Sequence, residues 1–282
     1  MNSKMKLLPL ASLLALIGPA YSATVIAQYG FAGNSNDSSG NGFNGVDTDM
    51  TYVVDGVRGT VASFNGVSSS VNVGASGQRL TENANDGAGN AQFAMSMWIK
   101  PTAVNPAGGN DTNILMGHPS GGGVIEIVGQ GSWGGMGGVN GSIGVNSGGG
   151  AGDVHNVPTI DVYDGNWHHI VIQWAETDLQ SGNAQFPIEL YIDNVLATDV
   201  NSNEYNGNGN GANLSLGGPA VWSNGGGADK YYTGLMSDVR FFDDQITSSE
   251  VNTLFTGVIP EPSSVSLLGL ATVGVLLRRR RR

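Results

Sequence analysis

Residues 93–101 read Phe-Ala-Met-Ser-Met-Trp-Ile-Lys-Pro, and their alternation is the clearest structural signal in the chain. The larger apolar side chains recur at every second position, whereas Ser96, Trp98 and Lys100 occupy the other face. Because successive side chains of a β-strand point to opposite faces, this period of two predicts a strand with one buried face.

Similar short runs surround this strand on both sides. Residues 188–192 alternate in the same way, and Asp193-Asn194 suits a hairpin turn because both residue types tolerate left-handed backbone angles. Further strands are expected at residues 25–29, 70–73, 124–128, 168–174, 214–216 and 232–242. A ladder of short strands bounded by Gly, Asn, Asp and Ser predicts one all-β domain over residues 23–256, an antiparallel sandwich or jelly roll.

One helix is predicted late in this domain. Thr247-x-x-Glu250 has the spacing of a capping box, in which each residue's side chain bonds the other's backbone N–H. Val251, Leu254 and Phe255 follow at helical spacing, so a short amphipathic helix is expected there.

The composition excludes several classes of protein. The chain has 282 residues with 45 Gly, no Cys and only 12% charged residues. Coiled coils and highly charged disordered chains need far more Glu, Lys and Arg. Without Cys, the chain has no disulfide framework, no thiolate zinc site and no thiol nucleophile.

The N-terminus reads as a signal peptide covering residues 1–22. Lys4 and Lys6 precede an apolar run from Leu7 to Ile17, and small residues follow at the end. The alternative, a transmembrane anchor, needs about 20 apolar residues, so export with cleavage before Ala23 is the better interpretation.

The C-terminus has three parts in order: Pro260-Glu261-Pro262 in a linker over residues 257–264, an apolar segment over residues 265–277, and Arg278, Arg279, Arg280, Arg281 and Arg282. The prolines end any preceding element, the apolar segment suits a short membrane helix, and the Arg run suits the cytoplasmic side. A basic nucleic-acid-binding tail is the alternative, but an Arg run beside an apolar segment on an exported chain favours a topology signal.

This tail resembles the PEP-CTERM protein-sorting signal of Gram-negative bacteria. The resemblance implies that an exosortase, a membrane-embedded transpeptidase-like enzyme, recognises the tail and cleaves near the tripeptide. It also implies transient membrane insertion through the C-terminal helix, and export to the cell envelope or extracellular space in species that make extracellular polysaccharide. The apolar run of 13 residues is short for a permanent span, as suits a processed signal.

The two ends hide how acidic the rest of the chain is. The whole chain carries a formal charge of −11, but residues 23–277 hold only five Lys and Arg and all 23 acidic residues, a formal charge of −18. Nucleic acids and anionic lipid surfaces would be repelled, so we expect neither as a partner.

A second set of motifs runs through the middle of the chain. In order they are Tyr29-Gly-Phe31-x-Gly33-Asn34-x-x-Asp37-Ser-Ser-Gly40-Asn41-Gly42, Ala62-Ser-Phe64-Asn-Gly66, Met95-Ser-Met-Trp98-Ile-Lys-Pro101, Asp164-Gly-x-Trp167-His168-His169, Leu190-Tyr-Ile-Asp193 and Gly234-Leu-Met-Ser-Asp238-Val-Arg-Phe-Phe-Asp243. Together they resemble the laminin G-like, concanavalin A-like jelly roll of bacterial surface proteins. Asn194 stands where the family usually has the Gly of the hairpin, and Ser237 replaces the first of two adjacent acids.

Calcium is the cofactor that this resemblance suggests. Asp37 and Asn41 lie in a glycine-rich turn with Asn34, and laminin G-like relatives often bind calcium at loop ends. Calcium takes six to eight oxygen ligands, which such a turn can supply. Asp238 could complete the site if the first and last strands are neighbours, as the resemblance implies. The alternative is that Asp37 and Asn41 only hydrogen-bond their own turn.

Sugar recognition would use exposed aromatic faces. Trp133 and Trp222 lie in Gly-, Asn- and Ser-rich segments, and Tyr231 is near the second of them. The segment around Trp133, residues 117–152, holds 16 Gly, and we expect long surface loops there rather than an organised ligand lid. Either tryptophan could equally fold back onto the sandwich.

Glycoside hydrolysis is the enzymatic alternative, since concanavalin A-like folds include glucanases. It needs two carboxylates facing the scissile bond, about 5–5.5 Å apart for retention. The strand around Glu126 has a lone Glu, and Glu189 and Asp193 flank a turn, so neither forms the pair. The sequence therefore favours a non-catalytic, envelope-associated protein that binds glycan or a matrix or surface protein. A glycan-cleaving enzyme and a purely structural matrix protein are the alternatives.

Overall fold

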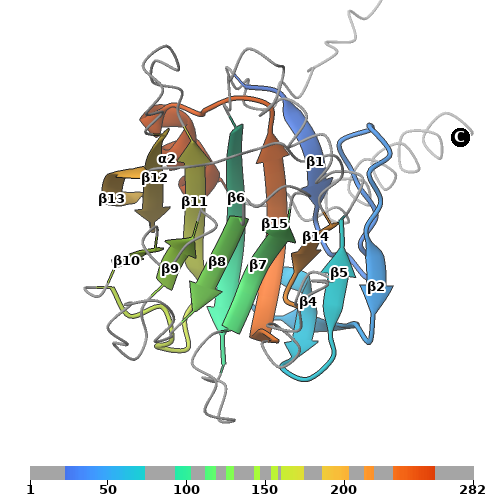
Figure 1. Ribbon diagram of the computed structural model, residues 1–282. Coiled ribbons are helices and arrows are strands. Elements are labelled where there is room, and N and C mark those ends of the chain that lie inside the picture. Colours follow the sequence, from blue (N-terminus) through green and yellow to red (C-terminus); the bar gives the residue numbers. More distant parts are fainter. Residues whose placement is uncertain are drawn as a thin grey trace, which may run out of the picture.

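The computed structural model describes residues 23–73, 93–102, 112–118, 125–129, 143–146, 154–157, 160–174, 186–202, 213–218 and 231–257. Figure 1 looks through one β-sheet onto a second one behind it, so the chain forms a sandwich of two layers. All strand pairs in the described part are antiparallel.

The first sheet, called sheet A here, has eight strands. Their order is β13 (Val195–Ser202), β12 (Phe186–Ile192), β11 (His168–Trp174), β6 (Phe93–Pro101), β15 (Thr233–Phe242), β4 (Gly59–Asn65) and β3 (Thr51–Asp55), with β1 (Val25–Tyr29) also paired to β15. Neighbours such as β6 and β15 are far apart in sequence, as expected of a jelly roll rather than a meander.

The second sheet, sheet B, has seven strands. Their order is β10 (Val154–Val157), β9 (Ile143–Asn146), β8 (Ile125–Gly129), β7 (Thr112–His118), β14 (Asn213–Leu216), β5 (Ser70–Asn72) and β2 (Val46–Thr48). The predicted sandwich is therefore confirmed, and the expected bounds of β1 and β11 match the structure. Seven strands were not among those expected: β2, β3, β4, β7, β9, β10 and β13. The short edge strands β2 and β3 are mostly exposed, so they lack the alternation of buried and exposed residues that marks a strand.

The main core lies between the two sheets. Met95, Met97 and Ile99 of β6 are at most 1% exposed and pack with Ile170 and Ile172 of β11. The alternation quoted for residues 93–101 therefore points its apolar face inward, as predicted, and leaves Ser96, Trp98 and Lys100 on the outer face of sheet A.

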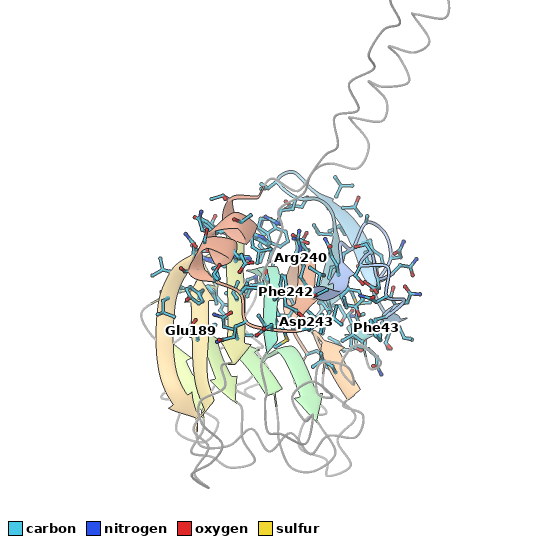
Figure 2. All side chains as sticks on the ribbon, turned by 90° about the horizontal axis from the view of Figure 1, so that it is seen from above. Phe43, Glu189, Arg240, Phe242 and Asp243 are labelled. Atoms are coloured by element: carbon cyan, nitrogen blue, oxygen red, sulfur yellow. The ribbon has the colours of Figure 1, made fainter. Side chains whose placement is uncertain are left out.

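A second, smaller core lies on that outer face beneath α2 (Ser248–Thr256). Val251 and Leu254 of the helix are buried against Ala94 and Val171 of the sheet. Seen from above, α2 lies on the side of sheet A away from sheet B (Figure 2). Both hydrogen bonds of the predicted capping box are present at its N-terminus, so this prediction is confirmed.

A β-bulge interrupts the last strand, β15. Its pairing with β6 shifts register between Ser237 and Arg240, and Asp238 in the bulge has a φ of 48°. Beyond the bulge, β15 pairs with β1, so the first and last strands are neighbours, as the family resemblance implied. Because a bulge re-aims the side chain it carries, Asp238 is directed to partners that regular pairing would not give it.

Candidate functional site

Asp37, the first residue of the predicted calcium site, lies in the turn after β1. Its Oδ1 accepts hydrogen bonds from the N–H groups of Gln28 at 2.9 Å and Ser39 at 2.8 Å. Its Oδ2 accepts from the Ser39 hydroxyl at 2.8 Å and from the N–H of Phe43 at 3.0 Å. Burial acts to raise the pKa of Asp37, but these donors outweigh it, and the pKa lies below its usual value.

Asn41 and the glycines beside it close the same turn. The Asn41 side-chain amide donates to the carbonyl oxygen of Ile26 at 2.9 Å, which fastens the turn to β1. Gly40 and Gly42 have φ values of 92° and 80°, which side chains rarely allow. The glycine-rich motif is therefore explained by the backbone path of this turn.

Asp238, the third predicted ligand, is held by an arginine. Arg240 donates from Nε to Oδ1 at 2.8 Å and from Nη2 to Oδ2 at 2.9 Å, a bidentate ion pair. Gln28 joins the two acids, because its backbone N–H bonds Asp37 and its side-chain amide lies 3.3 Å from Asp238 Oδ1. The structure thus brings the predicted ligands close together along the chain's first and last strands. Their side-chain oxygens do not converge on one position for an ion.

The donors around these residues bear on calcium binding. Within the described segments, no three His, Asp or Glu side chains are grouped so that they could hold one ion. Calcium at Asp37 or Asp238 would have to displace the N–H groups or the guanidinium that now bond their oxygens. Calcium binding therefore stays a prediction, and the alternative of an internally bonded Asx turn describes the observed geometry.

The residues proposed for sugar stacking are only partly described. Tyr231 is half-buried and lies against Gly218, just after β14. Trp133 and Trp222 lie outside the described residues, as do the signal peptide, the Pro-Glu-Pro tripeptide and the Arg run. None of the helices in the described segments is long and apolar enough to cross a membrane.

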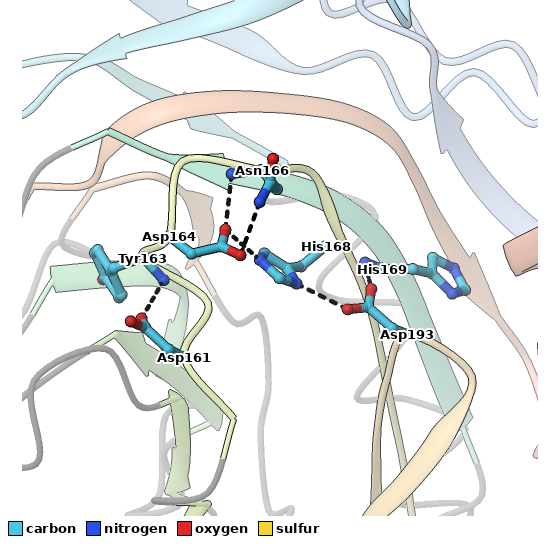
Figure 3. A network of polar contacts seen from close by, with 7 residues as sticks. All are labelled: Asp161, Tyr163, Asp164, Asn166, His168, His169 and Asp193. Atoms are coloured by element: carbon cyan, nitrogen blue, oxygen red, sulfur yellow. Dashed lines mark hydrogen bonds and ion pairs between the residues drawn. The ribbon is translucent and has the colours of Figure 1, made fainter.

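His168, the first residue of β11, is held between two carboxylates. His168 Nδ1 lies 2.8 Å from Asp193 Oδ2, and Nε2 lies 3.0 Å from Asp164 Oδ1 (Figure 3). The bond to Asp193 is the main cause that raises the pKa of His168, against the effect of burial. Asn166 and His168 in turn lower the pKa of Asp164 to about 2. Both shifts favour the charged forms, in which His168 and the two carboxylates make an ion cluster.

This cluster fixes a hairpin. Asp193 and Asn194, between β12 and β13, have φ values of 51° and 67°, the pair of left-handed residues that a tight hairpin needs. Asp193 also accepts the backbone N–H of His169 at 2.8 Å. Asn194 can therefore replace the family's usual Gly, since Asn tolerates this region.

His169 faces the opposite way, onto the outer face of sheet A. Its Nε2 lies 2.8 Å from Ser96 Oγ, and its side chain is fully buried. Desolvation lowers the pKa of His169 to about 4, so the ring is neutral at physiological pH. The two adjacent histidines thus have separate partners, because successive residues of a strand point to opposite faces.

Beside His169 lies a stack of rings and one guanidinium. The Arg58 guanidinium carbon is 3.8 Å from the Trp98 ring centre and 5.5 Å from that of Trp167. The Trp98 ring centre lies 4.9 Å from that of His169 and 5.8 Å from that of Phe255 in α2. We call Arg58, Trp98, Trp167 and His169 the arginine stack.

Asp55 anchors the turn that carries Arg58. Its Oδ1 accepts from the N–H groups of Val57 and Arg58 and from Trp167 Nε1 at 3.1 Å. No pattern in the sequence indicated that Arg58 lies here. The alternation of β6 identifies Trp98 as outward-facing, whereas nothing local indicates that a turn between β3 and β4 reaches it.

The outer face of sheet B has a different character. Leu214 and Leu216 of β14 belong to the core, so Ser215 between them lies on the outer face, where it is 5% exposed. Backbone pairing continues the Ser215 row across the sheet through Asn72, Met116, Glu126 and Asn146. We call these five residues the sheet B row; it places Glu126, the lone acid considered for catalysis, in a line of mostly polar residues.

The other acids considered for glycoside hydrolysis are held within sheet A. Glu189 accepts hydrogen bonds from Gln173 Nε2 at 2.6 Å and from the Tyr191 hydroxyl at 3.0 Å. Asp193 is engaged by His168. Both carboxylates therefore have structural partners.

Two antiparallel sheets with crossing strand order define a jelly-roll β-sandwich. The chain belongs to the concanavalin A-like lectin/glucanases superfamily, whose laminin G family model matches residues 65–252, more than half of the chain. A second family model, the PEP-CTERM protein-sorting motif, matches residues 258–282. The chain is therefore an exported protein of the cell envelope or extracellular space, with a tail of the kind that exosortase-type enzymes process.

Several solved structures share the fold. Domain 4 of AbnA, an extracellular arabinanase from Geobacillus stearothermophilus solved with arabinotriose, is 21% identical, with a TM-score of 0.58 over 83% of this chain and 99% of that one. The binding domain of Paraclostridial Mosquitocidal Protein 1 is 16% identical, with a TM-score of 0.54 over 82% of this chain and 52% of that one. A Trypanosoma rangeli sialidase is 14% identical, with a TM-score of 0.56 over 82% of this chain and 32% of that one. A search of curated proteins finds no match.

Proposed function

We propose that the protein is a non-catalytic binding module of the cell surface whose outer sheet B face holds a glycan. The sheet B row carries this proposal, because it lines up Asn, Ser and Glu residues across four neighbouring pairs of strands. Amides, hydroxyls and carboxylates bond sugar hydroxyls as donors and acceptors. In the described part, α2 packs on part of the outer face of sheet A, whereas no helix packs on sheet B.

The similarity to domain 4 of AbnA supports a carbohydrate ligand. That domain was solved with arabinotriose, and the present chain matches 99% of its length. The two therefore agree in size as well as in fold. Tyr231, Trp133 and Trp222 would add aromatic faces for sugar rings, as the sequence analysis proposed.

Binding of purified full-length protein to an array of neutral and acidic oligosaccharides tests the proposal. We expect saturable binding that Glu126→Gln and Asn146→Ala each weaken about tenfold, as loss of one or two hydrogen bonds would do. Asn252→Ala is the matched control, because Asn252 is exposed on α2 at the other sheet. Trp133→Ala and Trp222→Ala test the aromatic contribution separately.

Binding by no oligosaccharide on the array would overturn the glycan proposal and favour a structural matrix role. Equal binding by the two sheet B variants and the wild type would move the site elsewhere on the domain. The same samples, repeated with calcium and with a chelator, show whether calcium contributes through Asp37, Asn41 and Asp238.

A glycan-cleaving enzyme is the alternative function, and Glu126 is the residue that would serve it. Release of reducing ends from the bound oligosaccharide, lost in Glu126→Gln, would replace the binding proposal with a hydrolytic one. Binding without release would retain it.

A further inference from the structure

The outer face of sheet A gathers positive charge in an acidic protein. The structure describes three Lys and Arg residues, Arg58, Lys100 and Arg240, and all three lie on or over this face. The whole chain carries a formal charge of −11. The few basic residues that the structure describes therefore gather on one face of an acidic protein.

Two of these cations have carboxylate partners and one does not. Lys100 lies 3.7 Å from Asp55, and Arg240 forms its bidentate pair with Asp238. Asp55 bonds the backbone N–H of Arg58, but no carboxylate among the described residues lies within ion-pair distance of the Arg58 guanidinium. The group of three cations and two carboxylates thus has one positive charge left over, on Arg58.

The hydrogen-bond donors of Arg58 indicate what would satisfy that charge. Its Nε and Nη2 are buried, and neither has a hydrogen-bond partner. Arg240 uses the same two nitrogens to hold both oxygens of the Asp238 carboxylate. Buried donors without acceptors cost free energy, so this edge of Arg58 favours a planar group with two acceptor oxygens.

The arginine stack holds this edge in a defined orientation. The guanidinium carbon lies over the Trp98 ring, 3.8 Å from its centre, and over the Trp167 ring, 5.5 Å from its centre. Burial lowers the pKa of Arg58 to about 10, so the group stays charged at neutral pH. A guanidinium already positioned by aromatic rings loses little further freedom when it binds.

His169, whose ring also lies against Trp98, adds a third hydrogen-bonding nitrogen. Its Nδ1 is buried and has no hydrogen-bond partner. When the Ser96 hydroxyl donates to Nε2, the neutral ring carries its proton on Nδ1. Three unmatched donors on two residues that contact Trp98 then favour an acceptor-rich ligand.

We propose that the Nε and Nη2 edge of Arg58 binds a carboxylate group supplied by a ligand from outside the chain, in the way that Arg240 binds Asp238. Because Nε and Nη2 are themselves buried, a ligand reaches them only when the turn that carries Arg58 shifts; this turn lies at the surface, where the adjacent Val57 is 78% exposed. This site is on sheet A and is independent of the glycan face proposed for sheet B. The carboxylate belongs either to a small free acid or to a sugar acid.

Titration of purified full-length protein with sodium acetate and sodium glucuronate tests the proposal, with sodium chloride balancing the ionic strength. Tryptophan fluorescence is the readout, because Trp98 and Trp167 contact Arg58. We expect a saturable change in the fluorescence of the wild type. Binding should be about tenfold weaker in Arg58→Lys, which keeps the positive charge but lacks the edge formed by Nε and Nη2. Lys100→Met is the control, since it removes a neighbouring charge and leaves that edge intact.

Saturation by both acids supports a site open to sugar acids, and saturation by acetate alone assigns it to small free acids. Saturation by neither, or equal affinity in Arg58→Lys, overturns the proposal. Should Arg58→Lys fail to fold, the Nε–H resonance of Arg58 in the unmutated protein decides, because acetate but not chloride is expected to shift it. Failure here leaves the sheet B proposal untouched, because the two sites use different faces.

Discussion

Asp37 shows at the scale of one residue how an expected metal ligand can serve a turn. Four donors point at its two oxygens, three of them backbone N–H groups. Asp37→Ala would leave these N–H groups without their acceptor, and we expect the free energy of unfolding to fall by about 1–3 kcal/mol. Urea denaturation measures this loss, with the exposed Asn36→Ala as control.

A calcium titration of the same two variants separates the alternatives. An increase in the unfolding midpoint with calcium in the wild type, absent in Asp37→Ala, would establish the predicted metal site. If Asp37→Ala is destabilised but calcium does not change the unfolding midpoint of the wild type, the role of Asp37 is to accept the hydrogen bonds of its own turn.

The opposite pKa shifts of His168 and His169 predict that the free energy of unfolding is greatest near pH 6.5. The pKa of His168 is raised, so its stabilising contribution is complete below pH 6.5 and is lost as the pH rises through its higher folded value. The pKa of His169 is lowered to about 4, so the unfolded chain takes up its proton first and stability falls between pH 6.5 and about 4. The difference between 6.5 and about 4 corresponds to roughly 3 kcal/mol.

Denaturation of single variants across pH 4–9 checks both limbs. His168→Gln should flatten the decline above pH 6.5, and His169→Gln should flatten the decline below it. The lowered pKa values of Asp164 and Asp193 add a further loss only at more acidic pH, as those carboxylates protonate. A wild-type stability that rises steadily through pH 8 would contradict the assignment of His168.

At the scale of an element, α2 is stabilised by its cap and by the sheet beneath it. Thr247→Ala removes the acceptor for the Glu250 N–H, and we expect a loss of about 1 kcal/mol. Leu254 is 5% exposed in the smaller core, so Leu254→Ala should cost about 2–4 kcal/mol. Thermal and urea unfolding measure both losses, and the exposed Ser249→Ala is the control. Equal effects at Leu254 and Ser249 would show that α2 does not stabilise the sandwich.

At the scale of the whole molecule, the tail and the acidic body have separate tasks. Replacing Pro260-Glu261-Pro262 by three alanines should block processing, so that the uncut protein stays in the membrane fraction through its apolar segment and Arg run. Deleting residues 258–282 should instead release the protein from the membrane. Immunoblots of membrane and medium fractions from an exosortase-bearing host measure both outcomes. Normal processing of the alanine variant would refute a role for the tripeptide.

Local patterns predicted those features whose causes lie within a few residues. The alternation at residues 93–101 requires only the period of a strand, and the capping box requires only two residues three positions apart. The hairpin at Asp193-Asn194 likewise depends on two residues that tolerate left-handed angles. Edge strands such as β3 escaped prediction because most of their residues are exposed, and in β3 only Tyr52 packs against the main core.

By itself the sequence determined an exported β-sandwich with one capped helix and a sorting tail, because periodicity, caps and terminal signals act over short distances. Only the tertiary structure decided that Gln28 joins Asp37 to Asp238, and that Arg58 stacks on Trp98 beside His169. These contacts depend on strand order, on the bulge in β15 and on the reach of the turn before β4, none of which a short window of residues specifies. The carboxylate site proposed at Arg58 arises from this crossing of distant strands.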